Sequence, residues 1–372
     1  MSSLMGLVDV YGLYVTLIQE NNKRKVMSSL ILKLREIINN PHQLDSTKEW
    51  IPLGDEDSPF ILVYGKALCF SIIKSTEVAP SNLLSYWKTI TKAPVNSFPA
   101  MEAYFKLTPF SLHGQEHFVS RRALGPCYKR IEKELPNWIS EFSENFFRAY
   151  KNNETISTSS LVVDYINQFN REILAHELSI DSNDLPAMPG EMAHMITTYK
   201  LVEAYDQRLQ ILVNFIEKTL NNIGLDMSEA WSLVSITVMG TEGLAGALLY
   251  GLANKPNKTD IWQAEDLVNL SYPVTLLARE PLCDLNINGL SLKKGQRLYV
   301  SPALASMLTN VNADETPDIP FGMGVHICPG KRISLTVINA FFNAWSHAEA
   351  LHPRISKVKF SRDFILRAKD IT

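Results

Sequence analysis

The sequence predicts a mainly α-helical protein with a small β part, on three observations. Apolar residues recur at three- and four-residue spacing through several long stretches, as in amphipathic helices. Strand-like pieces are few, chiefly Phe60–Tyr64 and a hairpin within Leu285–Val300. No linker, internal repeat or low-complexity block divides the 372 residues. We therefore expect one large helical domain over residues 1–372.

The first of the predicted helices differs from the others. Leu4–Ile18 is apolar but short, is broken by Asp9, and has no cationic stretch before it. We expect an amphipathic helical segment within residues 1–25, and neither a signal peptide nor a membrane anchor. The later predicted helices are Leu30–Ile38, Leu135–Tyr150, Leu161–His176, Met192–Leu220, Asp226–Asn254 and Arg332–His347.

The predicted strands follow local signals. Asn288-Gly289 lies inside the Leu285–Val300 stretch. This dipeptide is typical of a two-residue hairpin turn, because both residues tolerate a positive φ. We therefore expect a hairpin that turns at Asn288.

Composition narrows the function classes. The net charge of −3 gives no sign of nucleic-acid binding. The cysteines are scattered without a C-x-x-C pair, which predicts neither a disulfide scaffold nor a zinc site. They are Cys69, Cys127, Cys283 and Cys328. We expect a cytoplasmic enzyme that acts on a small molecule and does not bind nucleic acid.

The most informative stretch is Pro320–Gly330, which reads PFGMGVHICPG. A cysteine thiolate is a strongly donating ligand, and it persists at neutral pH only if its pKa is held down. Backbone N–H groups of a Gly-rich turn, a helix start and a bound iron all do this. Three glycines lack a Cβ and let the backbone lie against a planar ligand. A buried structural cysteine is the usual alternative for a single Cys.

The spacing F-G-x-G-x-H-x-C-x-G resembles the heme-thiolate loop of the cytochrome P-450 family. The resemblance implies a cytochrome P-450-like fold, heme b (iron protoporphyrin IX) as cofactor, and Cys328 as the iron ligand. Residues 321–330 are the loop, and the resemblance extends from about residue 60 to the end. The implied heme contacts in it are Phe321, Gly322, Gly324, His326, Cys328 and Gly330.

Two further segments resemble parts of the family that hold the heme propionates. His117 and Arg121 stand as the H-x-x-x-R pair of its helix C and share one helix face. Arg279, five residues before Asp284, resembles the arginine that follows its helix K. With His326, these side chains are expected to give charge-assisted hydrogen bonds to the propionates. Alone, the pair on helix C is more often a solvated helix face.

Asp226–Asn254 resembles the distal, I-type helix of the family. Met239–Gly243 aligns with its A-G-x-(D/E)-T motif, so Gly240 and Glu242 match while Gly243 replaces the threonine. The resemblance implies that Glu242 supplies protons during O–O cleavage, with Thr241 as a displaced hydroxyl. The alternative for Glu242 is a solvated helix end or a satisfied core acid.

The chain departs from the family near its helix K. The Glu-x-x-Arg pair is missing, because Asp266 is followed by Asn269 and Glu265 by Val268 at that spacing. The stretch from Ser306 to Phe321 is too short for the family's meander. Removing both partners of a buried ion pair costs less stability than removing only one of them. We therefore interpret the chain as a shortened, divergent bacterial-type member.

The resemblance implies a monooxygenase-like heme-thiolate oxidoreductase acting on a small organic substrate in specialised metabolite biosynthesis. A heme enzyme without normal O₂ activation (an isomerase, a dehydratase or a peroxide-dependent enzyme) is the alternative, and a non-catalytic heme-binding partner is a third. Basic residues near the implied heme face suit an acidic ferredoxin or flavodoxin, although they equally suit a solvated face. They are Arg121, Arg122, Lys129, Arg130, Lys133, Lys331 and Arg332.

Overall fold

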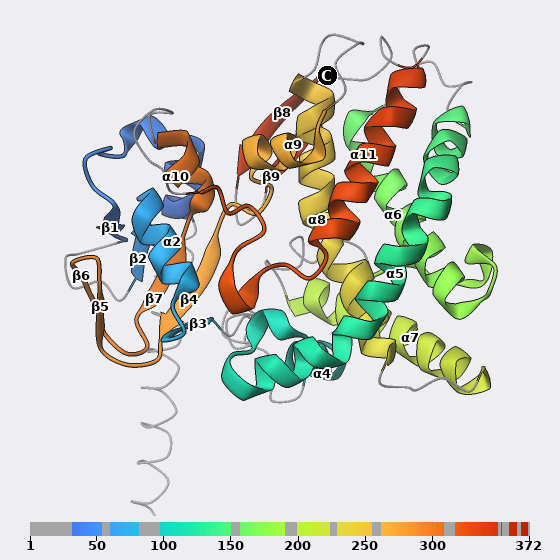
Figure 1. Cartoon of the computed structure of the whole chain (residues 1–372), viewed down its shortest axis with the longest axis horizontal. Helices are drawn as coiled ribbons and strands as arrows, with labels where there is room; N and C mark the ends of the chain where they lie inside the picture. Colours follow the sequence, from blue (N-terminus) through green and yellow to red (C-terminus); the bar gives the residue numbers. More distant parts are fainter. Residues whose placement is uncertain are drawn as a thin grey trace, which may run out of the picture.

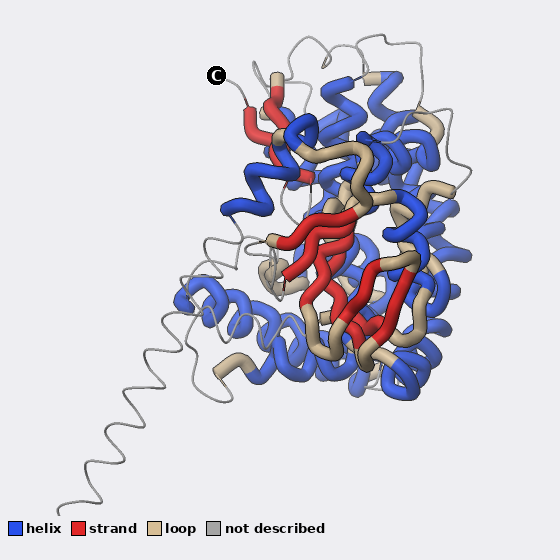
Figure 2. The backbone as a smooth tube through the Cα atoms, turned by 90° about the vertical axis from the view of Figure 1, so that its left-hand side faces the viewer, coloured by secondary structure: helices blue, strands red, loops and turns tan. Residues whose placement is uncertain are grey.

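A computed structural model describes residues 32–53, 60–81, 97–149, 157–189, 199–223, 229–254, 262–308, 317–348, 351, 357–362 and 366–370. The predicted helical segment at residues 1–25 lies outside them. Most helices gather on one side of the molecule, and a small sheet with α2 and α10 forms the other (Figure 1). Seen from the sheet side, the strands lie in front of the helices (Figure 2). The prediction of a mainly helical fold with a small β part is confirmed.

The helices match the predicted stretches closely, apart from short ones that the apolar periodicity did not indicate. Residues 32–39 are helical, and residues 309–316 of the short stretch before the cysteine loop are not described. The longer helices are α5 (Gly114–Ala149), α6 (Thr158–Leu178), α7 (Tyr199–Asn222), α8 (Glu229–Asn254) and α11 (Lys331–His347). The shorter ones are α2 (Lys66–Lys74), α4 (Pro99–Leu107), α9 (Ala264–Ser271) and α10 (Pro302–Leu308). Short 3₁₀ turns are η1 (Pro41–Gln43), η2 (Pro109–Ser111), η4 (Ser182–Asp184) and η6 (Gly324–His326).

Helix α8 crosses the centre of the helical side. It is apolar on nearly all faces, which is typical of a helix enclosed by others. It packs against α5, α6, α7, α9 and α11. Among the described residues it is the one helix long and apolar enough to span a membrane, but 78% of its most apolar window is buried inside the protein. Its composition therefore reflects a core position.

Helix α5 corrects one sequence-based expectation. We predicted a short helix around His117 and a separate one from Leu135, whereas the structure has a single helix over Gly114–Ala149. Pro126 and Pro136 lie inside it. Each removes one backbone hydrogen bond, but the helix buries a continuous apolar stripe against α8 and α11. Tertiary packing outweighs the local cost.

The main sheet has the strand order β1-β2-β7-β4-β3, with β2 and β7 parallel and the other pairs antiparallel. Its strands are β1 (Trp50–Pro52), β2 (Phe60–Val63), β3 (Val78–Pro80), β4 (Leu277–Pro281) and β7 (Arg297–Val300). Two hairpins stand apart from it, β5 (Leu285–Ile287) with β6 (Leu290–Leu292), and β8 (Val358–Arg362) with β9 (Leu366–Asp370).

The Leu285–Val300 stretch only partly forms the predicted hairpin. Asn288 and Gly289 make the expected turn, with φ of 49° and 83°. The hairpin ends at Leu292, however, and Gly295, with φ of 76°, turns the chain so that β7 joins the main sheet. Antiparallel pairing of β7 with β4 aligns Arg279 with Leu298. Because β3 pairs with the other edge of β4, the backbone at Arg279 is held on both sides.

The packing of α8 on α9 and α11 gives a test of the fold. A Cβ added at Gly251 would lie 2.9 Å from Cε2 of Phe342 and 3.1 Å from Cδ2 of Leu267. We expect Gly251→Ala to lower the free energy of unfolding by about 1–3 kcal/mol, because the added methyl overpacks this contact. Gly240→Ala is the control, since nothing lies within 4 Å there, and it should raise stability by about 0.5–1 kcal/mol. Urea denaturation measures both, and equal stabilities would contradict the packing.

Candidate functional site

A cavity of about 450 Å³ lies between α8 and the loop that precedes α11. That loop passes between the sheet side and the helical side of the molecule (Figure 1). The volume is in the range of small-molecule and cofactor sites. Gly240, Glu242 and Gly243 of α8 line it, as do Phe321, Cys328 and Gly330 of the loop. The two motifs singled out in the sequence therefore face the same space.

The loop before α11 is held in a tight shape by its own backbone. The N–H of Cys328 donates to the carbonyl of Phe321 at 2.8 Å, and that of Gly322 donates to the carbonyl of Ile319 at 2.9 Å. Gly322 and Gly324 have φ of 68° and 60°, a region that side chains with a Cβ seldom adopt. The loop thereby brings the Cys328 thiol to the cavity just before α11 begins.

Cys328 is a free cysteine and is half-buried. Burial raises the pKa of this thiol, while the backbone N–H of Gly330 and the charge of Arg121 lower it. Burial is the largest of these effects, so the group is a neutral thiol at pH 7 unless a cation binds it. A metal ion would deprotonate it outright.

Four nitrogen-bearing side chains gather along one edge of the cavity, and they are those predicted from the sequence: His117, Arg121, Arg279 and His326. The rings of His117 and His326 lie 4.2 Å apart between centroids. Arg121 donates from Nη1 to the carbonyl of Ile327 at 2.6 Å, so it also holds the loop directly before Cys328. Helix α5, strand β4 and the cysteine loop thus converge on one polar edge.

The surroundings of the two histidines at this edge favour their neutral forms. Burial, followed by the charge of Arg121, lowers the pKa of His117 below its usual value. For His326, burial and the nearby His117, Arg279, Arg121 and His113 lower the pKa to about 4. Each imidazole therefore offers one N–H donor at pH 7. An anion bound at this edge would favour the protonated forms.

Arg279 shows that this edge suits an anion. Burial lowers the pKa of its guanidinium to about 10, so it stays charged at pH 7. Its side chain donates to the neighbouring carbonyl of Ala278 at 3.0 Å, and within the described part of the chain it forms no ion pair with a carboxylate. A buried cation without a counter-charge is costly. Carboxylate groups of a planar cofactor lying beside Cys328 would supply that counter-charge, so the residues present fit the predicted heme.

The α8 wall brings together only part of the predicted catalytic set. Gly240, Glu242 and Gly243 line the cavity, whereas Thr241 is not among the lining residues. Its hydroxyl donates to the carbonyl of Thr237 at 2.8 Å and accepts from Nδ2 of Asn170 at 2.9 Å. Thr241 therefore joins α8 to α6 and does not present its hydroxyl to the cavity. A Cβ at Gly243 would meet only Cγ2 of Val274, at 3.8 Å.

Several hydroxyl-bearing residues that the sequence analysis did not single out line the cavity, among them Tyr128 and Ser235. Burial raises the pKa of Tyr128, and a hydrogen bond with Ser235 lowers it. The sequence spacing could have indicated both residues, because Ser235 precedes Glu242 by seven residues and Tyr128 follows Arg121 by seven. Residues two helical turns apart share a face. Thr108, Pro109 and Phe110 also line the cavity.

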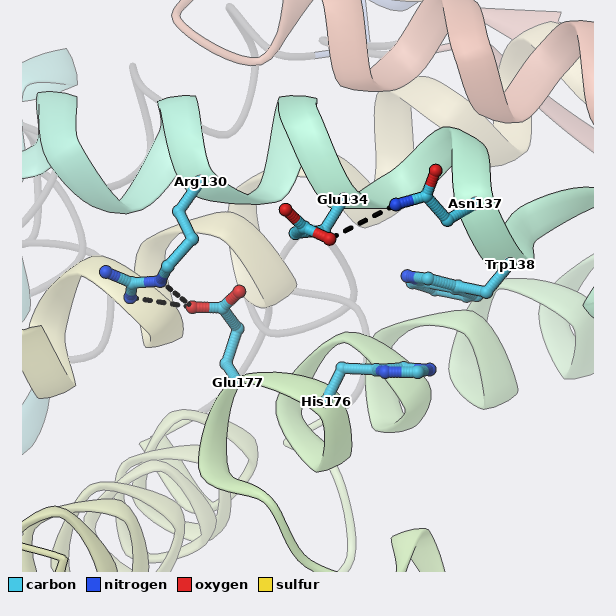
Figure 3. Close-up of a pocket in the computed structure, with 6 residues that line it drawn as sticks. All are labelled: Arg130, Glu134, Asn137, Trp138, His176 and Glu177. Atoms are coloured by element: carbon cyan, nitrogen blue, oxygen red, sulfur yellow. Dashed lines mark hydrogen bonds and ion pairs between the residues drawn. The ribbon is translucent and has the colours of Figure 1, made fainter.

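The predicted basic surface is largely neutralised by carboxylates. Arg130 bonds Glu177 and Glu229, each at 2.7 Å from a guanidinium nitrogen. Lys331 pairs with Glu265 at 3.4 Å, and Arg332 with Glu132 at 3.9 Å. Figure 3 shows Arg130 and Glu177 beside a second hollow of about 420 Å³, where Trp138 stacks on His176 at 4.6 Å. Within the described residues, Arg122 and Lys129 keep no carboxylate partner, so the basic surface is small.

Comparisons with known proteins place the fold. No protein-family model matches the chain. The steroid C26-monooxygenase of Mycolicibacterium smegmatis is 26% identical over 155 residues, covering 36% of this chain and 36% of that protein. The chain thus matches about a third of the length of this curated relative.

Solved structures match far more of the chain. P450BioI in complex with an acyl carrier protein ligated to hexadec-9Z-enoic acid has a TM-score of 0.65 at 14% identity, covering 90% of this chain and 98% of that one. Epothilone B-bound cytochrome P450epoK also gives 0.65 at 14% identity, covering 90% and 96%.

Proposed function

We propose that this chain, which has the cytochrome P-450 fold over about nine-tenths of its length, is a heme-thiolate oxidoreductase that oxygenates a small organic substrate. One observation carries the proposal. The free Cys328 thiol, the acid Glu242 and the Arg279 cation, which has no carboxylate partner among the described residues, line the same cavity. A thiolate ligand, an anion-binding edge and a proton source are the three protein parts that such an oxygenase requires.

Heme b is the cofactor that this set of residues fits. Cys328 would bind the iron, and His117, Arg121, Arg279 and His326 would hold the propionates. When bound, heme supplies a redox-active iron whose thiolate ligand donates electron density that favours O–O cleavage. Gly322 and Gly330 leave room for the macrocycle beside the loop, and Phe321 lies next to them on the wall, whereas the predicted contact Gly324 is not among the lining residues.

Glu242 is the proposed proton source. Glu242 lines the cavity on the α8 wall. Burial raises the pKa values of Tyr104 and Tyr205, and the nearby Glu242 adds to both shifts. A carboxyl in such a place delivers a proton to the face opposite Cys328. Gly240 leaves the backbone open beside it, while Gly243 offers no hydroxyl to hold water.

The substrate proposal follows from the lining of the cavity. Apolar side chains dominate around the polar edge, among them Phe110, Met239, Leu244, Ala247 and Leu277. They suit a mostly apolar organic molecule. The similar proteins support the same substrate class, because their names refer to a steroid, an acyl-carrier-protein-linked fatty acid and epothilone B. We place the reaction in specialised metabolite biosynthesis, with a ferredoxin- or flavodoxin-type protein as electron donor.

One observation favours a second candidate function. Gly243 and the engaged Thr241 leave the α8 wall without the hydroxyl that is expected beside the acid. A heme enzyme driven by peroxide, or an isomerase or dehydratase, does not need that hydroxyl. Product formation with an electron donor and O₂, with hydrogen peroxide alone, and with neither separates the classes. We expect product only in the first case, and product without any oxidant would overturn the oxygenase proposal.

Arg279 gives a test of cofactor anchoring. We expect Arg279→Met to speed heme transfer to an apo-globin acceptor by at least about tenfold, because a charge-assisted bond is worth about 1.5–3 kcal/mol. Arg297→Met is the control, since it removes an arginine from the neighbouring strand β7 and does not line the cavity. Equal transfer rates in the two variants would contradict the assignment of Arg279 to a propionate.

A further inference from the structure

Arg362, at the end of β8, caps helix α9. Its guanidinium donates from Nη2 to the carbonyl of Ser271 at 2.7 Å and from Nη1 to that of Tyr272 at 2.9 Å. These are the last carbonyls of α9, where the helix dipole is negative and intrahelical partners are missing. The side chain is buried, and within the described residues it has no carboxylate partner. The positive charge of Arg362 therefore stabilises the carbonyl end of α9.

The backbone of Arg362 is fixed as well. Its N–H donates to Oδ1 of Asn39 at 2.8 Å, and its carbonyl accepts from Nδ2 of the same side chain at 2.9 Å. This reciprocal pair ties β8 to the helical residues 32–39. At the start of β9, the N–H of Leu366 donates to the carbonyl of Pro273 at 2.8 Å. The C-terminal hairpin thus holds three consecutive carbonyls at the end of α9.

Tyr272 extends the link towards the cysteine loop. Its φ of 40° is left-handed, a conformation that is unfavourable for a large side chain and persists only where contacts hold it. Its hydroxyl donates to Oδ1 of Asp318 at 2.9 Å and accepts from the N–H of Ile319 at 3.4 Å. Lys66 at the start of α2 lies 3.5 Å from the same carboxylate oxygen. Tyr272 therefore joins the end of α9 to Asp318 and Ile319, which lie shortly before Phe321.

This chain of contacts borders the proposed heme cavity without taking part in its chemistry. Tyr272, Pro273, Ile319 and Phe321 contribute to the cavity wall. From Ile319 onward, backbone hydrogen bonds hold the loop together: Gly322 donates to Ile319, and Cys328 donates to Phe321. A displacement of Asp318–Ile319 would be passed along these bonds to the thiol. The sequence has no Glu-x-x-Arg pair at α9 to prevent such a displacement.

We propose that Arg362 and Tyr272 are positioning residues that fix the end of α9 and, through Asp318, the loop that presents Cys328. The link replaces an internal acid–arginine pair on α9 with an arginine supplied from the C-terminal hairpin. The inference rests on the proposed function in one respect, namely that the purpose of the loop geometry is to keep Cys328 as an iron ligand.

The test uses the full chain with three variants. Arg362→Met removes the charge at similar length, Arg362→Lys keeps a charge that reaches only one carbonyl well, and Tyr272→Phe removes a single hydroxyl. We expect heme transfer to an apo-globin acceptor to be about tenfold faster in Arg362→Met and Tyr272→Phe, and intermediate in Arg362→Lys. The reduced CO complexes of the first two should also show a mixture of thiolate and neutral-thiol bands.

Two controls separate positioning from general stability. Lys359→Met removes an exposed charge from the same strand, and Gly251→Ala lowers global stability by overpacking α8 against α9 and α11 without removing a bond of the link. Neither should produce the neutral-thiol band. The double variant Arg362→Met/Tyr272→Phe should transfer heme no faster than the worse single variant, because both act on one link. Additive effects, or the same band in Gly251→Ala, would overturn the proposal.

Hydrogen exchange in the heme-free chain keeps this test independent of the proposed function. We expect the amides of residues 318–330 to exchange faster in Arg362→Met and Tyr272→Phe than in wild type, with the exchange of α6 unchanged. Unchanged exchange in residues 318–330 would overturn the link. A wild-type chain that takes up no heme would overturn the proposed function, while the exchange result would still stand by itself.

Discussion

Replacing Cys328 by serine is expected to abolish the thiolate-type Soret band of the reduced CO complex and to end oxygenase turnover. The Cys328 sulfur is the one cysteine sulfur that lines the cavity among the described residues. A serine hydroxyl has a similar size but is far less acidic than a thiol, so it does not become an anionic ligand at neutral pH. Since loss of supporting groups alone costs metal sites about 10–100-fold, we expect turnover to fall by at least about 10²-fold.

The Cys328→Ser experiment has a matched control in Cys283→Ser. Cys283 is exposed and lies outside the cavity, so this variant should keep the wild-type spectrum, heme content and turnover. Heme retained at the histidine and arginine edge in Cys328→Ser would show up as a spectrum without the red-shifted band. A wild-type band in Cys328→Ser would mean that another group binds the iron.

Replacing Glu242 by glutamine is expected to lower turnover by about 10²-fold or more, the usual scale for a lost acid–base group. Glutamine keeps the shape of the side chain at the α8 wall but cannot release a proton. The substrate-induced spectral shift should therefore be nearly unchanged, which separates proton delivery from binding. Turnover and titration of the same preparation measure both.

Gly243→Thr is the gain-of-function arm of the Glu242 experiment. The missing hydroxyl should let the wild type divert reductant to hydrogen peroxide. A threonine here has room, because the nearest atom to the added Cβ is 3.8 Å away, and it should raise the fraction of reductant recovered in product. Full coupling in wild type together with normal turnover in Glu242→Gln would contradict the assigned role of α8.

The sequence anticipated those features that depend on short-range patterns. The apolar periodicity of Asp226–Asn254 was sufficient for α8 (Glu229–Asn254) because a core helix is apolar along its whole length. The turn at Asn288-Gly289 was predicted because few residues tolerate its φ values. Likewise, the cysteine loop is recognisable because its glycines and its cysteine are close in sequence, and Gly322, Cys328 and Gly330 line the cavity whereas Gly324 does not.

Features that depend on distant contacts were not predictable from local patterns. The prolines in α5 favour a helix break locally, and only packing on α8 and α11 keeps the helix continuous. The link from Arg362 to the end of α9 joins residues about ninety positions apart, so no motif in either segment indicates it. The lowered pKa of His326 likewise depends on burial, and then on four cationic or titratable neighbours, all of which only the fold brings together.

The most direct test of the heme-thiolate assignment is the absorption spectrum of the purified wild-type chain, loaded with heme, reduced and saturated with CO. The assignment predicts one heme per chain and a red-shifted, thiolate-type Soret band. A chain that binds heme with the band of a histidine or neutral-thiol ligand, or that binds no heme in stoichiometric amount, would contradict it.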